Sequence, residues 1–293
     1  MQGLVIENIA DLYKVEFEDE IYECMARGKI KKDGESLIVG DIVDFEIKNK
    51  EKKLALINEI CKRNVYIKRP KISNVSKIIL VVSSKNPKPD LLMLDKQLAF
   101  AEFLGINVLI VLNKLDLDEK NKFKEIEKIY KNIGYNVILT EAKDGIGIDE
   151  LKKGLKNNIN VFSGNSGVGK STLINKIFSS NITAEGEISS RNKRGKNTTT
   201  NTTLYKINKN TYIADTPGFS TFNIDEIESK QLENYFIEFK KNRNLCEFVG
   251  CSHIKEQNCN IKKLVKEEKI SLSRYENYCK IYNELKNKED KKW

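Results

Sequence analysis

The chain has 293 residues, 40% of them hydrophobic and 32% charged, so it is long enough for one sizeable core with smaller satellites and for one to three domains. No run approaches the roughly 18 apolar residues of a membrane span, and residues 1–7 lack the basic and then apolar layout of a signal peptide. We therefore expect a soluble, cytoplasmic protein with no membrane partner. The formal charge of +9 suits an anionic partner, although a lysine-rich proteome would produce the same excess.

Residues 1–66 are predicted to form short β-strands, because hydrophobic and polar residues alternate in residues 13–17 and again in residues 43–47. Several short strands in so short a segment indicate a small OB-like barrel. The basic residues 27–32 lie between strands, where such a barrel could offer them to RNA. Many barrels of this kind only pack against another domain, so the pattern leaves both roles open.

Residues 67–222 alternate between strand and helix patterns. Mostly apolar runs, typical of strands buried on both faces, lie at residues 78–82, 108–112, 137–139 and 159–162. Helical patterns lie at residues 91–104, 122–132, 148–156 and 170–178. This alternation predicts an α/β domain with a mainly parallel sheet, in which ligands bind outside the carboxyl ends of the strands.

Residues 223–293 are predicted to be helical and charged around a cysteine cluster, with a fraying helix or tail at the end. The predicted fold class is therefore multidomain. An OB-like barrel over residues 1–66 precedes the α/β domain of residues 67–222, and a helical zinc-binding domain follows over residues 223–293.

The segment Gly164-Asn165-Ser166-Gly167-Val168-Gly169-Lys170-Ser171 fits the phosphate-loop pattern and stands between a predicted strand and a predicted helix. Glycines let backbone N–H groups turn toward phosphates. Lys170 is expected to reach the β- and γ-phosphates, and the Ser171 hydroxyl to bind Mg²⁺. We include Thr172 among the nucleotide-binding residues. The alternative is an ordinary glycine-rich turn.

Two segments that directly follow predicted strands carry candidate guanine-binding residues. In Asn113-Lys114-Leu115-Asp116 the Asp116 carboxylate suits the N1–H and 2-amino groups of guanine, and the Lys114 stem can lie along the base. In Thr140-Glu141-Ala142-Lys143 the backbone amide of Ala142 could contact the guanine O6. Adenine offers no matching donors, so this set favours GTP and disfavours a P-loop ATPase. Alone, the first segment is also a good strand-end turn.

The segment Asp215-Thr216-Pro217-Gly218 follows a predicted strand at residues 211–214. Asp215 is expected to hold Mg²⁺ through water and the Gly218 amide to sense the γ-phosphate, the alternative being a plain turn. A basic loop at residues 194–200 precedes it, and there we favour Thr199 as the second Mg²⁺ hydroxyl. Phe219 stands where many GTPases carry a water-orienting glutamine, so intrinsic hydrolysis should be slow.

The order of these segments is rotated. The guanine-binding segments at residues 113–116 and 140–143 precede the phosphate loop at residues 164–171, whereas ordinary GTPases begin with the phosphate loop. The sequence therefore predicts a circularly permuted GTPase.

Cys246, Cys251, His253 and Cys259 provide three thiolates and one imidazole, a complete tetrahedral ligand set for one structural Zn²⁺. His253 is the only histidine of the chain, which makes its place inside a cysteine cluster hard to attribute to coincidence. The alternative is a set of unligated core residues. With all four positions filled by protein, such a site leaves no open position for hydrolytic chemistry.

Together these features resemble the ribosome small subunit-dependent GTPase A family of circularly permuted GTPases. The resemblance implies GTP hydrolysis stimulated by the 30S subunit during its late maturation, and contact with 16S rRNA. The permuted order itself suggests that hydrolysis is coupled to release, because the segment after Asp215 runs straight into the zinc-binding domain. We also expect a monomer. Family members commonly carry histidine where this chain has Asn197, which can orient a water but cannot accept its proton. The candidate catalytic residues are Lys170, Thr199 and Asn197. A non-hydrolysing, GTP-dependent RNA-binding adaptor is the alternative function.

Overall fold

The computed structural model describes residues 1–28, 30, 36–182, 202–215 and 224–291. Two compact units are present. The first comprises residues Met1–Ile79, Gly147–Ser163 and Lys170–Phe219, and the second comprises Leu80–Ile146, Gly164–Gly169 and Ser220–Trp293. Each unit is thus assembled from segments that are far apart in the sequence. None of the helices in the described ranges has both the length and the apolar character that a bilayer crossing requires.

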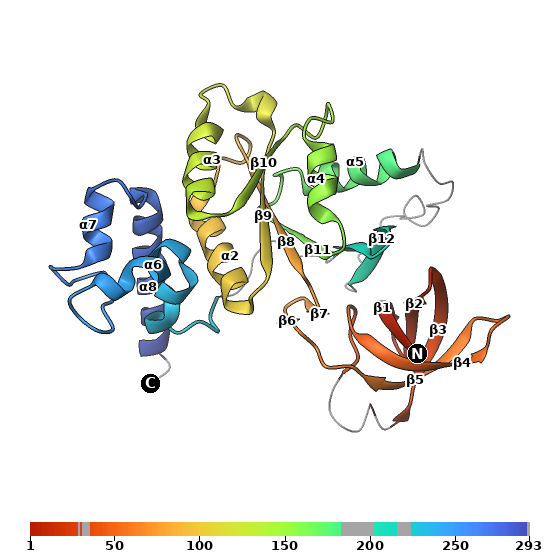
Figure 1. Cartoon of the computed structure of the whole chain (residues 1–293). Coiled ribbons are helices and arrows are strands. Elements are labelled where there is room, and N and C mark those ends of the chain that lie inside the picture. Colours follow the sequence, from red (N-terminus) through yellow and green to blue (C-terminus); the bar gives the residue numbers. More distant parts are fainter. Residues whose placement is uncertain (29, 31–35, 183–201, 216–223, 292–293) are drawn as a thin grey trace. The chain divides into compact units, whose positions relative to one another are not determined.

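The amino-terminal part of the first unit is a barrel of strands β1 (Gln2–Ile9), β2 (Leu12–Phe17), β3 (Glu20–Ala26), β4 (Ile42–Asn49) and β5 (Leu54–Ile60). Strand β1 pairs with both β2 and β4, so the sheet closes on itself (Figure 1). The inward positions of the alternating strands fill the core, with Val5, Val15, Val43, Phe45 and Ile57 all almost fully buried. The predicted OB-like barrel is confirmed.

The first unit also contains the small hairpin β6 (Tyr66–Lys68) and β7 (Lys71–Ser73), helices α4 (Ile148–Leu155) and α5 (Lys170–Ile182), and three strands of the α/β sheet. These strands are β11 (Ile159–Ser163), β12 (Thr203–Asn208) and β13 (Thr211–Asp215). Strand β11 is parallel to β13, and β12 is antiparallel to β13. One pair, Glu7 with Thr203, joins β1 to β12.

In the second unit, β9 (Asn107–Asn113) and β10 (Asn136–Thr140) are parallel and in register, and β9 lies between β10 and β8 (Lys77–Ser83). Helix α2 (Leu91–Leu104) begins where the Asp90 carboxylate accepts the Met93 N–H at 2.9 Å. It ends at Gly105, whose φ of +67° suits a residue without a side chain. Helix α3 (Lys122–Ile133) follows β9. The parallel α/β arrangement is confirmed, with element ends shifted by a few residues.

The carboxyl-terminal part of the second unit consists of the 3₁₀ turns η2 (Ser229–Tyr235) and η3 (Arg243–Leu245) and helices α6 (Ile237–Asn242), α7 (Asn260–Lys266) and α8 (Leu272–Asp290). Its core is aromatic: the rings of Phe239 and Tyr278 are 4.4 Å apart, and those of Phe236 and Tyr278 are 5.2 Å apart. Residues 283–290, predicted to fray, continue helix α8.

A buried charge network joins this helical part to the α/β part of the same unit. Arg274 of α8 is 1% exposed; it donates to Asp95 of α2 at 2.6 Å and, through two nitrogens, to Glu238 of α6 at 2.8 and 3.0 Å. Asp95 also accepts hydrogen bonds from Tyr130 of α3 and Asn277 of α8, each at 2.7 Å. Burial alone would lower the pKa of Arg274, but the two carboxylates raise it, so the guanidinium stays charged.

We predict that Arg274→Ala lowers the free energy of unfolding by about 3 to 5 kcal/mol, because it leaves two buried carboxylates without their cation. Urea-induced unfolding followed by circular dichroism measures this change. Lys269→Ala is the control, because Lys269 makes an exposed ion pair with Glu267 and its loss should cost less than about 1 kcal/mol. Equal stability of the two variants would contradict the structural role of the network.

Candidate nucleotide and metal sites

One buried amide connects three of the segments that the sequence singles out. Asn113 and Thr140 are paired at the carboxyl ends of β9 and β10, and Asn113 is 1% exposed. Its Oδ1 accepts hydrogen bonds from the Thr140 hydroxyl at 3.0 Å and from the Ala142 N–H at 3.3 Å. Its Nδ2 donates to the Val168 carbonyl of the phosphate loop at 2.9 Å. Residues 113–116, 140–143 and 164–169 therefore meet at one edge of the sheet.

The glycines of the phosphate loop allow this close approach. Gly169 has φ +99°, and a Cβ there would lie 2.3 Å from Asn113 Nδ2. Gly164 has φ +140°, and a Cβ there would lie 2.3 Å from the Val81 carbonyl oxygen. Any larger residue would strain the backbone and push the loop away from the sheet. The residues present fit the backbone cradle that a nucleotide phosphate requires.

Two carboxylates follow β9, and the structure distinguishes them. Lys114 adopts the left-handed conformation and leads into the turn η1 (Leu115–Leu117), in which Asp116 is exposed. Asp118 instead accepts the N–H groups of Lys122 and Phe123, both at 3.0 Å, at the start of α3. Because Asp118 serves as a helix cap, Asp116 is the carboxylate of this turn that can face a base.

The loop between β8 and α2 supports the turn that begins at Lys114. This support was not predicted from the sequence. The Ser84 hydroxyl donates to the Lys114 carbonyl at 2.6 Å, and the Lys114 ammonium donates to the Asn86 carbonyl. A side chain of the phosphate loop also reaches the start of α2, because Asn165 Nδ2 donates to Asp90 at 3.4 Å. No sequence signal identified this loop, because its residues match no motif and their partners lie far along the chain.

The remaining predicted phosphate and magnesium residues lie in the first unit. Lys170, Ser171 and Thr172 begin helix α5 directly after Gly169 in the chain, and Asp215 is the last residue of β13. Burial lowers the pKa of the Lys170 ammonium, because the charged form loses hydration. An anionic phosphate would compensate for that loss.

Four residues with predicted roles in binding or catalysis lie outside the described part of the chain: Asn197, Thr199, Gly218 and Phe219. Their roles stay predictions.

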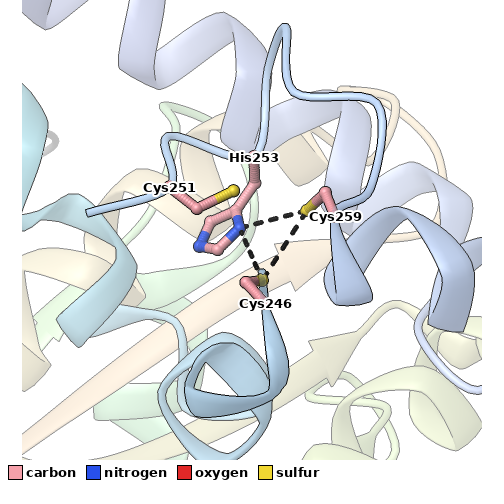
Figure 2. Close-up of side chains that lie close together, drawn as sticks. All are labelled: Cys246, Cys251, His253 and Cys259. Carbon is pink, nitrogen blue, oxygen red and sulfur yellow. Dashed lines mark hydrogen bonds between the residues drawn. The ribbon is translucent and has the colours of Figure 1, made fainter. Parts of the chain in front are cut away.

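The four predicted zinc ligands lie together in the carboxyl-terminal part (Figure 2), with their ligand atoms all within 4.8 Å of one another. His253 Nδ1 is 3.2 Å from Cys259 Sγ and 3.7 Å from Cys246 Sγ, and the last two sulfurs are 3.9 Å apart. Tetrahedral zinc with Zn–S bonds of about 2.3 Å places sulfurs about 3.8 Å apart. The donor set and its spacing therefore fit a structural zinc ion.

Burial determines the protonation of two thiols of this cluster. Burial raises the pKa of the Cys251 thiol to about 12 and also raises that of Cys259, so the thiols alone would stay protonated at neutral pH. A divalent cation reverses that preference by stabilising thiolates. The cluster is held on α8, because the hydroxyls of Tyr275 and Tyr278 donate to the carbonyls of His253 and Ser252 at 2.8 and 3.1 Å.

Glu233 is a further residue of this region that the sequence did not reveal. Its Oε2 lies 2.8 Å from His253 Nε2, and its Oε1 accepts from Arg243 at 3.0 Å. Glu233 precedes the cluster by more than ten residues and belongs to no zinc-binding pattern.

Family models match most of the chain. Residues 58–225 match the model described as RsgA GTPase, and residues 2–54 match the RsgA N-terminal domain. The chain belongs to the RsgA GTPase family. It is therefore a GTP hydrolase, with GTP as substrate and GDP as product, as predicted. The adaptor and ATPase alternatives are disfavoured by this membership.

Named relatives extend over the whole chain. The small ribosomal subunit biogenesis GTPase RsgA of Alkaliphilus metalliredigens is 39% identical over 97% of this chain and 98% of its own. The protein of the same name from Clostridium novyi is 39% identical, with both chains covered completely.

Two solved structures share the fold. YjeQ from Thermotoga maritima superposes with a TM-score of 0.85 at 35% identity, covering 97% of this chain and 98% of that one. YloQ, described as a circularly permuted GTPase, has a TM-score of 0.83 at 29% identity, covering 98% and 95%. The predicted fold class is confirmed: a circularly permuted α/β GTPase domain with an amino-terminal OB-like barrel and a carboxyl-terminal helical region that carries the Cys/His cluster.

We predict that Asn113→Ala weakens GDP binding by about 10- to 100-fold, because it removes three hydrogen bonds and leaves the Thr140 hydroxyl and the Val168 carbonyl without their partner. Titration of a fluorescent GDP analogue measures the dissociation constant. Asn132→Ala on the exposed face of α3 is the matched control and should bind as the wild type does. If both variants bind alike while their melting curves stay normal, the amide does not organise the site.

Proposed function

We propose that the chain is a GTPase of small ribosomal subunit biogenesis that binds GTP and Mg²⁺ and contacts 16S rRNA. The relatives that match over their full length carry this biogenesis role in their names. The observation that carries the nucleotide part is the Asn113 amide, which holds the two guanine-binding segments and the phosphate loop together. The excess of positive charge, +9 over the chain, supports an RNA partner.

In the proposed site Asp116 accepts the N1–H and 2-amino groups of guanine, and the stem of Lys114 lies along the base. Residues 164–169 enclose the phosphates with backbone N–H groups. Lys170 neutralises the β- and γ-phosphates, while Thr172 and Lys143 complete the nucleotide contacts at the helix start and beside the base. We assign Asn113 a positioning role, since its amide oxygen already accepts two hydrogen bonds from the protein.

The magnesium ion is proposed to bind the Ser171 hydroxyl and Thr199 directly and Asp215 through water, and the Gly218 amide is proposed to sense the γ-phosphate. Phenylalanine at position 219 cannot orient water, and Asn197 cannot accept a proton from it. Hydrolysis by the protein alone should therefore be slow. We propose that the small subunit completes the catalytic site and that hydrolysis then triggers release.

The buried Arg274 network limits which parts of the second unit can move separately when GTP is hydrolysed. Because Arg274 links α8 to Asp95 of α2, moving the carboxyl-terminal helices alone would separate buried charges. We propose that these helices move together with the guanine-binding part of the second unit. The segment after Asp215 leads along the chain to these helices, and it is the proposed sensor of the γ-phosphate.

We further propose one structural zinc ion held by Cys246, Cys251, His253 and Cys259, a monomeric state and a cytoplasmic location. The domain limits we propose remain 1–66, 67–222 and 223–293. Zinc would fasten a segment that has few apolar residues of its own, and it would supply no reacting group.

We predict that single-turnover GTP hydrolysis is slow for the isolated protein and accelerates by about tenfold or more with purified small subunits; partners accelerate other GTPases by about 10³- to 10⁵-fold. Large subunits are the matched control and should not stimulate. Lys170→Ala should abolish the stimulated reaction. Fast turnover by the protein alone, or no response to small subunits, would contradict the proposal, and the second result would favour the adaptor.

A second readout addresses release. Affinity for the small subunit should be higher with a non-hydrolysable GTP analogue than with GDP, because the proposal makes GTP the docking state. Equal affinities would contradict the coupling of hydrolysis to release and would leave the hydrolysis result unaffected.

A further inference from the structure

The single histidine of the chain offers two different ring nitrogens, and the structure assigns them different partners. Nδ1 of His253 faces the sulfurs of Cys246 and Cys259 (Figure 2), at 3.7 and 3.2 Å. Nε2 lies 2.8 Å from Glu233 Oε2. A neutral imidazole carries one proton, and a metal binds the nitrogen that lacks it. Because a carboxylate only accepts, the proton belongs on Nε2 and the lone pair on Nδ1.

We propose that Glu233 is the positioning residue of the zinc site, fixing the tautomer and the ring direction of His253 so that zinc binds Nδ1. This inference rests on the zinc ion proposed above. A carboxylate that accepts the second N–H of a ligating histidine also makes the imidazole a stronger donor to the metal.

Glu233 is suited to this role because it is itself held in place. Its second oxygen accepts from Arg243 Nη1 at 3.0 Å, and Arg243 also contacts Asn234. Glu233 lies in η2 and Arg243 in η3, which leads directly to the ligand Cys246. The Glu233 carboxylate thus connects η2, the turn before the cluster, with the segments that carry Cys246 and His253.

The rest of the pocket holds the ring without selecting a nitrogen. His253 is fully buried, and its ring packs edge-on against Phe239, with centroids 5.6 Å apart and an interplanar angle of 87°. Tyr278 lies on another side, with its centroid at 6.1 Å. These aromatic contacts would tolerate a ring flipped by half a turn, whereas the Glu233 hydrogen bond would be lost. The carboxylate therefore selects the orientation.

The first test reads the tautomer directly. Protein labelled with ¹⁵N-histidine and purified without a histidine tag contains one imidazole, so a long-range ¹H–¹⁵N spectrum of the zinc-loaded chain has a single assignment. We expect a protonated Nε2 and a metal-shifted Nδ1. Protonated Nδ1 with zinc on Nε2 would overturn the assignment of Glu233. A wild-type chain that holds no zinc at all would instead overturn the zinc proposal.

The second test measures zinc affinity by competition with a chromophoric chelator. Glu233→Ala should weaken zinc binding by about 10- to 100-fold. Glu233→Gln keeps an acceptor and loses the charge, so its loss should be smaller. Glu247→Ala, next to Cys246 and exposed, removes the same charge and should bind zinc as the wild type does. Wild-type affinity in Glu233→Ala would overturn the inference. The tautomer measurement on the wild type decides the question if that variant does not fold.

Discussion

The proposed nucleotide site depends on a few hydrogen bonds made by one side chain. The Asn113 amide accepts from the segment of residues 140–143 and donates to the phosphate loop, so segments separated by 27 and 55 positions become a single structure. Permutation of the chain leaves this geometry intact, because the carboxyl ends of parallel strands meet at the same edge whatever order they have in the sequence. The rotated motif order and an ordinary guanine-binding arrangement are therefore compatible.

The second unit continues from this site to the Cys/His cluster through a series of polar contacts. The phosphate-loop residue Asn165 contacts Asp90 at the start of α2, and Asp95 of the same helix pairs with Arg274 of α8. Helix α8 in turn holds the cluster through Tyr275 and Tyr278. The buried contact between Asp95 and Arg274 requires specific geometry, so it helps to define how the helical part sits on α2. A zinc ion bound to the Cys/His cluster would further fix the geometry of the segment that α8 holds.

Much of the fold could be predicted because its signals are local. Apolar runs and helical periodicity located β9, β10, α2 and α3 to within a few residues, and the spacing of Cys246, Cys251, His253 and Cys259 identified a cluster that the structure brings together. The segment of residues 113–116 was recognisable from its residue types and its place after a strand.

The missed features are pairs of residues far apart in the sequence. Arg274 looks like a surface charge on a polar helix, and its burial is explained by two partners, Glu238 and Asp95, of which Asp95 is 179 positions away. Glu233 has no motif around it, and its role depends on which histidine nitrogen faces the sulfurs. Asn113 was predicted as a nucleotide ligand, but nothing local showed that its amide would bond to Val168.

Calorimetric titration of the purified chain with GDP and with ADP, in the presence of Mg²⁺, tests most directly whether residues 113–116, 140–143 and 164–169 form one guanine site. The account predicts that GDP binds and that ADP binds about a thousandfold more weakly or worse, because adenine would leave the Asp116 carboxylate without donors. Comparable affinities for the two nucleotides would contradict it.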